Sequence, residues 1–397
     1  MNSADIRGPA QLRPIMLLGA AAFASSATTR IADPLLPLIA EEFSAHVAEA
    51  SVVVTGFTLA YGLCQVIYGP VGDRYGKYAV VTVMTLLSAI ATGLAAVSDT
   101  LPMLGFLRLA SGATAAALIP LAMAYIGDTV PYAGRQAVLA RFLAGTMLGA
   151  IAGQASGGIL GQLFGWRGVF VVLAGLYLLV GLLLVNEIRS GRASMTHGKV
   201  KLFDLVASIP ELTRSFRVRV VTGTVFCEGS LFFGAFAFVG AFIRSAYGIS
   251  FAAIGGLLAC FGLGALLYSA LAPKIVAGLG QRNMVVVGGA LLALCFLAIA
   301  LQPPLLALPL PITLCGFGFF LFHNTLQTLA TQMAPTVRGM AVSLFAAGFF
   351  LGQGGGVWLA GRLLTVIDYP PLFIGVGGLL FGLSLVFRRL LRILDPA

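Results

Sequence analysis

Apolar residues fall into many long runs along the chain, and short polar stretches separate one run from the next. Each run is roughly 20 residues long, the length that a helix needs to cross a hydrocarbon core of about 30 Å. The runs show no alternation of apolar and polar residues, so a β-barrel is not favoured. The pattern therefore predicts an all-α polytopic membrane protein, whose helices satisfy their own backbone hydrogen bonds inside lipid.

The runs predict twelve transmembrane helices in two groups of six. The first group covers residues 14–40, 48–70, 79–98, 102–127, 137–162 and 167–187. The second group covers residues 216–243, 251–272, 283–301, 305–333, 340–364 and 369–387.

Residues 188–215 form the one long polar connection and divide the chain into three parts. An N-terminal six-helix bundle covers residues 1–187, and a C-terminal six-helix bundle covers residues 216–397. Within this cytoplasmic linker, residues 199–212 alternate charged and apolar side chains. This pattern indicates a short interfacial helix, with a disordered linker as the alternative.

The composition agrees with a membrane protein. Hydrophobic residues make up 59% of the chain and charged residues only 10%, whereas a soluble domain carries about 25% charged residues. This excludes a soluble enzyme. The five cysteines lie inside apolar runs without paired spacing and the three histidines are scattered, so we predict reduced cysteines and no metal site.

The net charge of +10 comes from basic residues that flank the apolar runs. We interpret this charge as membrane topology, not as a sign of nucleic-acid binding. Of the 24 lysines and arginines, three lie on one side, two within spans and 19 on the side that holds both termini. Positive residues favour the cytoplasm, so the chain is predicted to lie in the plasma (inner) membrane with both termini cytoplasmic.

The two halves resemble each other in sequence. Pro131-Tyr-Ala-Gly-Arg135-Gln-Ala-Val is similar to Pro335-Thr-Val-Arg338-Gly-Met-Ala-Val, and the pair Gly153-Gln154 is similar to the pair Gly352-Gln353. The offset is about half the chain, as a duplicated six-span unit would give. The fold prediction is therefore two pseudo-symmetric six-helix bundles.

The segment Gly69-Pro-Val-Gly-Asp73-Arg74-Tyr-Gly76-Lys77 lies between the second and third spans. It closely resembles the loop signature of the major facilitator superfamily. The resemblance implies that the aspartate faces a helix N-terminus of the other half, where the helix dipole favours a carboxylate. It also implies that the basic residues pair with an acid at the inner end of the fourth span. The cytoplasmic gate predicted in this way consists of Gly69, Asp73, Arg74, Gly76, Lys77 and Asp128.

Three further segments resemble parts of this superfamily. Arg108 in Leu107-Arg108-Leu-Ala-Ser-Gly112 resembles the arginine motif of its proton-coupled members. Asp33-Pro34-Leu-Leu-Pro37 is similar to the twelve-span drug:proton antiporters and to exporters of the arabinose-efflux-permease type. The glycine-rich fifth span, Gly149 to Gly158, resembles the antiporter motif, although Gln154 stands where that motif has proline. This departure weakens the inference to antiport.

The buried charges fall at two depths. At about 1.5 Å per helical residue, Asp33 and Arg108 both lie roughly 10 Å below the outer surface. Glu228 and His323 both lie near the midplane. Burial disfavours the charged form of an aspartate and a nearby arginine restores it, so a change in their distance changes proton affinity. We predict proton coupling by Asp33 with Arg108 as its preferred partner, and Glu228 as the second candidate.

By the resemblance, the first, fourth, seventh and tenth spans line the central path, and Arg30 and His323 face it as well. The predicted substrate cavity consists of Arg30, Gln65, Gln154, Phe232, Phe236, His323, Asn324, Gln327 and Gln353. Two alternatives remain at this point: lipid-facing packing for the phenylalanines, and a purely structural hydrogen bond for the histidine.

No phosphate-binding loop and no catalytic constellation are visible in the sequence, so an enzyme is not predicted. The leading hypothesis is a proton-coupled secondary active transporter that exports drugs or small amphiphilic metabolites. Its partners are a small-molecule substrate, protons and membrane lipid; it needs no cofactor besides the proton gradient, and the resemblance implies a monomer. One alternative is an importer or facilitator for a sugar, organic acid or amino acid. The other is a transporter-like sensor or lipid-handling protein.

Overall fold

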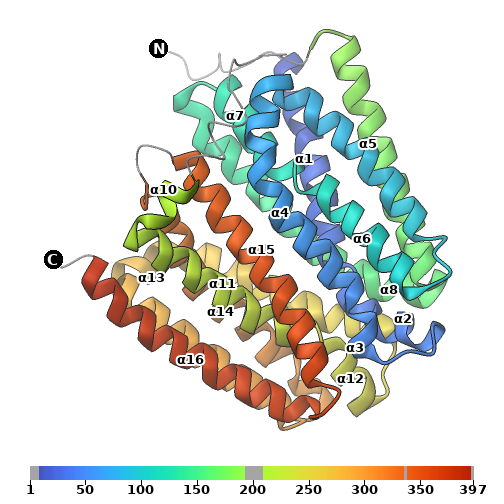
Figure 1. Cartoon of the computed structure of the whole chain (residues 1–397), viewed down its shortest axis with the longest axis vertical. Helices are drawn as coiled ribbons and strands as arrows, with labels where there is room; N and C mark the ends of the chain where they lie inside the picture. The colour runs from blue at the N-terminus through green and yellow to red at the C-terminus, as the bar shows by residue number, and fades with distance from the viewer. Residues whose placement is uncertain (1–8, 193–208, 335–337, 395–397) are drawn as a thin grey trace.

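The computed structural model describes residues 9–192, 209–334 and 338–394, and within these ranges the structure is helical with no strand. The first half contains α1 (Pro9–Arg30), η1 (Asp33–Leu35), α2 (Leu36–Glu42), α3 (Val47–Ala50), α4 (Val52–Tyr75), α5 (Lys77–Ala95), α6 (Leu101–Ala115), α7 (Leu118–Thr129) and α8 (Tyr132–Arg189). The second half contains α10 (Ile209–Arg214), α11 (Phe216–Phe236), α12 (Val239–Tyr247), α13 (Phe251–Ala300), η2 (Leu305–Ala307), α14 (Pro309–Ala330), α15 (Arg338–Leu363) and α16 (Tyr369–Leu394) (Figure 1).

Ten helical stretches in the described ranges are long and apolar enough to cross a membrane. Their ends agree closely with the predicted spans: the fourth was expected at 102–127 and covers Leu101–Thr129. Two stretches, Gly134–Arg189 and Phe251–Ala300, are 56 and 50 residues long, more than twice what one crossing requires. Each of them coincides with two consecutive predicted spans.

The helix α8 reverses direction at Gly165, which has non-helical angles with φ at +69°. Before this bend α8 runs alongside α1 in the same direction, with Gly149 against Phe23, Gly153 against Ala27 and Gly157 against Ile31. After the bend the order is opposite, because Tyr177 bonds to Thr28 while the later Glu187 pairs with Arg13 near the start of α1. The helix therefore crosses the membrane twice.

The helix α13 reverses in the same way at Gly280, where φ is +66°. The contacts before the bend pair Gly264 with Thr313 and Tyr268 with Asn324, so this part runs parallel to α14. The contacts after it pair Gly288 with Phe322 and Leu291 with Gly318, so the later part runs antiparallel. If α8 and α13 each count as two crossings, the ten candidate stretches among the described residues correspond to twelve membrane-spanning segments.

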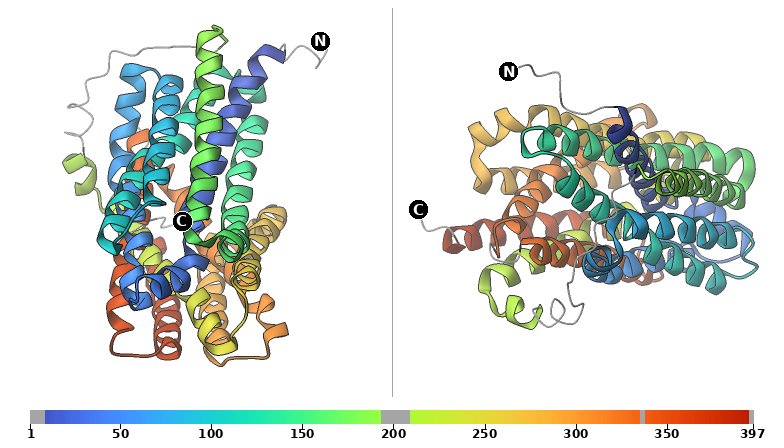
Figure 2. Two further views of the ribbon diagram at one scale, coloured as in Figure 1. Left: turned by 90° about the vertical axis from the view of Figure 1, so that its right-hand side faces the viewer. Right: turned by 90° about the horizontal axis from the view of Figure 1, so that it is seen from above.

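The two halves form separate bundles that lie side by side, blue to green and yellow-green to red in Figure 1. We call the end that carries the chain termini the inner end, because the basic residues predict that it is cytoplasmic, and the opposite end the outer end. Across the interface α4 packs against α15, and α8 packs against α13. The bundles approach each other near α2, α3 and α12 and diverge toward the inner end (Figures 1 and 2).

Cross-bundle contacts near the outer end are made by small residues and backbone. Gly158 of α8 lies against Gly255 of α13, and the Gln162 side chain accepts a hydrogen bond of 3.1 Å from the amide of Ala252. Gly361 lies beside Ser51 on the α15 side. The structure is therefore closed at the outer end, while the helices of the two bundles diverge toward the inner end.

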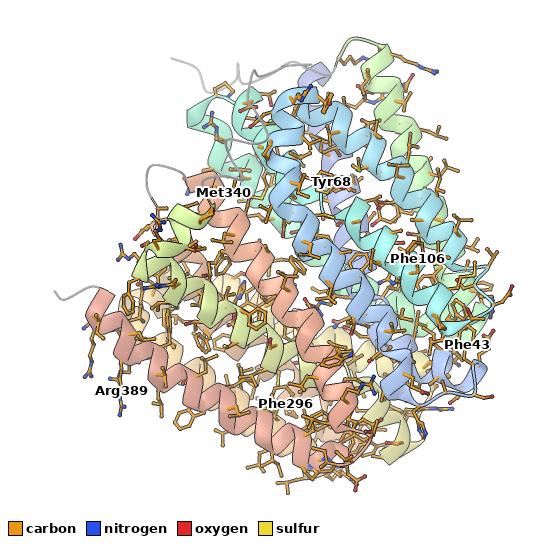
Figure 3. The ribbon with its side chains drawn as sticks, viewed as in Figure 1. Phe43, Tyr68, Phe106, Phe296, Met340 and Arg389 are labelled. Carbon is orange, nitrogen blue, oxygen red and sulfur yellow. The ribbon has the colours of Figure 1, made fainter. Side chains whose placement is uncertain are left out.

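Large apolar side chains both fill the bundles and cover their outside. Phe296 is fully buried between helices of the second half, whereas Phe106 of α6 is 69% exposed (Figure 3). Many other leucine, isoleucine and valine side chains are exposed along the same helices. An exposed apolar belt of this kind suits a lipid environment.

The predicted interfacial helix at 199–212 lies mostly outside the described residues. Its last described part, Ile209–Arg214, is helical.

Candidate functional site

Two interruptions within the candidate spans lie directly beside candidate residues. The helix α1 ends at Arg30 and resumes as η1 at Asp33, and α11 ends at Phe236 before α12 begins at Val239. Each interruption leaves carbonyl groups of the last helical turn without partners in the helix. Such groups are tolerated at membrane depth only where protein or a cavity satisfies them. The interruptions therefore mark places where polar side chains are needed.

Arg108 supplies donors to one of these interruptions. Its side chain is almost fully buried; Nη2 donates to the carbonyl of Thr28 in the last turn of α1, and Nε donates to the carbonyl of Val53, both at 3.2 Å. The guanidinium also lies 4.4 Å from the centre of the Phe57 ring. Arg108 thus joins α6 to α1 and α4 by hydrogen bonds to the backbone.

The expected ion pair between Asp33 and Arg108 is not what the structure shows. The ion-pair partner of Asp33 is Arg30, whose Nη1 lies 3.8 Å from Oδ2. The depth estimate placed both predicted partners near the outer end, but Arg108 is held by the carbonyls of Thr28 on α1 and Val53 on α4.

Arg30 connects the two bundles. With the Gln353 amide oriented so that its oxygen faces the guanidinium, that oxygen accepts hydrogen bonds of 2.9 and 3.2 Å from Arg30. The guanidinium carbon also lies 3.7 Å from the centre of the Phe233 ring on α11. The Arg30 cation of the first bundle therefore contacts the Gln353 amide and the Phe233 ring of the second bundle. The sequence analysis predicted Arg30 and Gln353 as cavity residues but did not predict their contact.

The Asp33 carboxylate is fully buried, and neither of its oxygens has a hydrogen-bond partner within the described part of the chain. A charged carboxylate in such a place costs free energy, because the interaction with water is lost and only the 3.8 Å ion pair replaces it. Binding of a proton removes most of this cost. The geometry therefore suits a group that exchanges a proton as its surroundings change.

A second buried pair lies in the C-terminal bundle. Glu228 of α11 is fully buried, and its Oε2 lies 2.7 Å from Nδ1 of His323 on α14. The imidazole stacks on Phe319 at 5.0 Å between ring centres and lies 4.7 Å from Phe349. The sequence analysis placed Glu228 and His323 at one depth, and the structure brings them into contact.

We expect Glu228→Leu to lower the free energy of unfolding by about 1–3 kcal/mol, because it leaves the buried His323 ring nitrogen without its acceptor. Glu228→Gln is the matched control, since its amide oxygen can accept the same hydrogen bond. Thermal unfolding of the detergent-purified variants measures the difference. Equal melting temperatures for the two variants would contradict a stabilising pair.

The remaining cavity candidates occupy different environments. Gln154 is buried and lines a pocket together with Arg30. Gln65 is buried on α4, Asn324 donates a 2.7 Å hydrogen bond to the Tyr268 hydroxyl, and Gln327 is exposed.

Phe232 and Phe236 are fully buried in a cluster of rings that includes Phe261. They pack the core of the second bundle, while the neighbouring Phe233 makes the contact with Arg30. The aromatic density in this segment was visible in the sequence, but which ring meets the cation depends on the rotation of α11 about its axis.

The predicted cytoplasmic gate is assembled within the first bundle. The Nζ atom of Lys77 lies 3.0 Å from Asp73 and 2.5 Å from Asp128, so the expected pairing of a basic residue with the acid at the end of the fourth span is present. Gly76 separates α4 from α5 with φ at +88°, an angle that favours glycine. Arg74 lies over the Tyr75 ring, and Gly69 lies inside α4. These contacts all lie within one bundle, as expected when the inner ends are apart.

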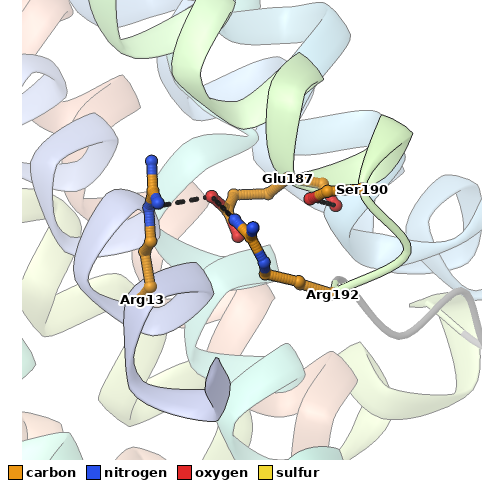
Figure 4. A network of polar contacts seen from close by, with 4 residues as sticks. All are labelled: Arg13, Glu187, Ser190 and Arg192. Carbon is orange, nitrogen blue, oxygen red and sulfur yellow. Dashed lines mark hydrogen bonds and ion pairs between the residues drawn. The ribbon is translucent and has the colours of Figure 1, made fainter. Parts of the chain in front are cut away.

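One buried charged cluster was not predicted. Glu187, near the inner end of α8, is fully buried and pairs with Arg13 at 2.9 Å and Arg192 at 3.3 Å (Figure 4). Ser190 donates a hydrogen bond to the carbonyl of Glu187. A lone glutamate near the end of an apolar run, with basic residues nearby, is the sequence signal that could have revealed this cluster. It fixes the start of α1 to the end of the sixth crossing.

The protein consists of two helical bundles that meet at polar residues, and these residues lie beside interrupted helices. This architecture is typical of secondary membrane transporters. The chain belongs to the major facilitator superfamily, because the model of that family matches residues 18–339. It is therefore a membrane transporter of this type and not an enzyme, and the predicted all-α polytopic fold of this superfamily is confirmed.

Relatives agree with this assignment. The MFS-type transporter YceJ of Bacillus subtilis is 24% identical over 375 residues, which cover 94% of this chain and 95% of the relative. The multidrug export protein EmrB of Haemophilus influenzae is 25% identical over 201 residues, which cover 51% of this chain and 39% of that protein.

Solved structures show the same fold. The nucleoside transporter NupG matches with a TM-score of 0.74 at 15% identity, covering 94% of this chain and 98% of NupG. A bacterial homologue of the human lysosomal transporter Spinster, in an inward-facing and unoccupied conformation, matches with a TM-score of 0.70 at 18% identity, covering 98% of this chain and 96% of that one.

Proposed function

We propose that this transporter is a proton-coupled secondary active transporter of small amphiphilic molecules, and that Asp33 is the group that carries the proton. The observation behind the proposal is the buried Asp33 carboxylate, which among the described residues makes no hydrogen bond within 3.5 Å and forms a 3.8 Å ion pair with Arg30. Arg30 in turn contacts Gln353 and Phe233 of the other bundle. A relative movement of the bundles changes the surroundings of Arg30 and hence the proton affinity of Asp33.

Transport in this proposal follows from rocking of the two bundles around the central residues. The structure represents the state that is open at the inner end, which we propose to be cytoplasmic. Closing the inner end brings the loop with Asp73 and Lys77 toward the second bundle, while the outer contact between Gly158 and Gly255 separates. The proton gradient supplies the free energy, and no further cofactor takes part.

We propose export as the direction of transport, with drugs or small amphiphilic metabolites as solutes. Support comes from the resemblance of Asp33-Pro34 to the drug:proton antiporters and from the partial similarity to a multidrug export protein.

The second candidate is a transporter that moves an organic acid together with a proton. Two observations favour it: Gln154 replaces the proline of the antiporter motif, and the cationic Arg30 lines a pocket beside Gln154.

Reconstitution of the purified protein in liposomes tests the coupling. An imposed pH gradient should drive accumulation of a transported solute, and an ionophore that dissipates the gradient should stop it. Movement of solute with the proton would select the second candidate, and movement against it would select antiport. Solute flux that ignores the pH gradient would refute proton coupling.

A further inference from the structure

A pocket lies at the interface of the two bundles, between α8 and α13. Most of its lining is apolar: Met147, Ala150, Ile151, Phe261, Gly262, Ala265 and Phe320. The two polar residues that reach it are Arg30 and Gln154. The pocket holds about 70 Å³ in this conformation, less than the roughly 300–1,000 Å³ of a complete small-molecule site, but its apolar lining with a few convergent polar groups has the usual form of such a site.

Both polar residues present hydrogen-bond donors. Gln154 is 2% exposed; its Nε2 makes no hydrogen bond within 3.5 Å among the described residues, and its side chain lies near the Asp33 carboxylate. A buried amide donor without a hydrogen-bond partner lowers the stability of the folded protein. A hydrogen bond to an acceptor atom of a bound ligand would remove this cost. The guanidinium of Arg30 adds a positive charge on the same pocket. Donors and a cation together favour an anionic group with two acceptor oxygens.

The internal competitor for Arg30 is Asp33, and the charges around Asp33 are few. They are Arg30 and, further away, Arg108, which is already bonded to two carbonyls. The neutral Gln154 side chain of α8 lies near the Asp33 carboxylate, and Gly240 of α12 lies against the Asp33 carbonyl. The titratable pair of the second bundle, Glu228 and His323, is engaged with itself.

A protonated Asp33 leaves Arg30 without a counter-ion, because Gln353 and Phe233 are both neutral. An external anion can then take the place of the aspartate beside Arg30. Conversely, an anion at Arg30 repels a charged Asp33 and favours its protonation. Binding of the anion and binding of the proton are therefore linked and reinforce each other.

We propose that the pocket binds an amphiphilic carboxylate. Its carboxylate oxygens accept hydrogen bonds from Arg30 and Gln154, its apolar part lies against Ile151, Phe261 and Phe320, and its binding places a proton on Asp33. The acid and the proton then cross together, so this proposal deepens the second candidate function and replaces export by antiport as the direction of transport. The role of Asp33 in this proposal rests on the proposed function. The preference for a carboxylate is argued from the residues that line the pocket.

Isothermal titration of the purified full-length protein at pH 7 tests the proposal with three matched sets of probes. Each set has one apolar group, phenylmethyl, pentyl or indolylmethyl, joined to a carboxylate, to a carboxamide or to an aminomethyl group. We expect at least one carboxylate to bind with a Kd about tenfold or more below that of its amide and its amine. Titration in two buffers of different ionisation enthalpy should show proton uptake of about one per carboxylate bound, as linkage requires.

Three variants separate the contributions of the residues. Arg30→Gln should raise the Kd of the carboxylate about tenfold or more and leave the amide unchanged. Gln154→Leu should raise it several-fold, and Asp33→Asn should keep the binding and lose the proton uptake. Arg141→Gln, an exposed arginine on α8, is the control. Size-exclusion profiles and melting temperatures establish that each variant is folded.

The proposal is overturned if no carboxylate of the three sets binds, if amides or amines bind as well, or if Arg30→Gln keeps the preference. Loss of all binding in folded Asp33→Asn would contradict the linkage. Selective carboxylate binding without flux driven by a pH gradient would instead refute the proposed coupling alone. Flux driven by the gradient without carboxylate preference would refute the pocket proposal alone.

Discussion

Asp33→Asn is expected to abolish solute accumulation driven by a pH gradient while leaving the protein folded. Asparagine has nearly the same volume as aspartate but neither binds nor releases a proton at this position. The change removes a buried carboxylate that has no hydrogen bond, so we expect the free energy of unfolding to fall by less than about 1 kcal/mol. Exchange of labelled for unlabelled solute without a gradient should persist, because it requires rocking of the bundles but no net proton movement.

Flux measurements in liposomes distinguish this outcome from general damage. Gradient-driven accumulation should fall to the level of empty liposomes, with exchange retained. Asp99→Asn is the matched control, because Asp99 is an exposed carboxylate between α5 and α6. Gradient-driven accumulation in Asp33→Asn at the level of the unchanged protein would remove Asp33 from the mechanism.

Gly158→Leu is expected to hold the outer ends of the bundles apart and to reduce transport about tenfold or more. A Cβ atom at residue 158 would lie 2.8 Å from the Cα of Gly255, closer than real Cβ atoms come, and would also meet the backbone of Phe251. Backbone cannot move aside as a flexible side chain can. The closed outer end would therefore be destabilised relative to the state open to that side.

Spin labels at residues 99 and 368, on outer loops of the two bundles, measure this separation in a background without native cysteines. The mean distance should lengthen in Gly158→Leu. Gly145→Leu is the control on the same helix, since a Cβ atom there meets nothing within 4 Å. An unchanged distance distribution in Gly158→Leu, together with normal transport, would show that this contact does not determine the outer closure.

The transmembrane helices could be predicted closely because the bilayer imposes a length and an apolarity on each of them. The reversals at Gly165 and Gly280 fall in the gaps between predicted spans, residues 163–166 and 273–282, although the helices on either side are nearly continuous. Depth along a helix is also readable from residue number, which is why Glu228 and His323 were placed at one level. The rotation of each helix is not readable in this way, and it decides which side chains meet.

The contacts of Asp33 and Arg30 could not be predicted from the sequence. Asp33 and Arg108 were assigned the same depth, but Arg108 donates to the carbonyl of Thr28 near the end of α1 and to that of Val53 on α4. Gln353 could be recognised as the repeat of Gln154, yet its contact with Arg30 depends on how the two bundles are packed. The pairing of Lys77 with Asp128 was predicted through the family resemblance, because the loop signature fixes both positions.

During synthesis, Arg30 enters the membrane long before the residues of the second bundle that contact it. Phe233 follows about 200 residues later and Gln353 more than 300 residues later. An arginine at the centre of a span costs about 2.5–3.5 kcal/mol during insertion by the translocon. Until the eleventh crossing has been made, Arg30 has Asp33 of its own crossing as counter-ion but lacks the hydrogen bonds to Gln353. The surroundings of Arg30 in the first bundle are therefore completed only after nearly the whole chain has been translated.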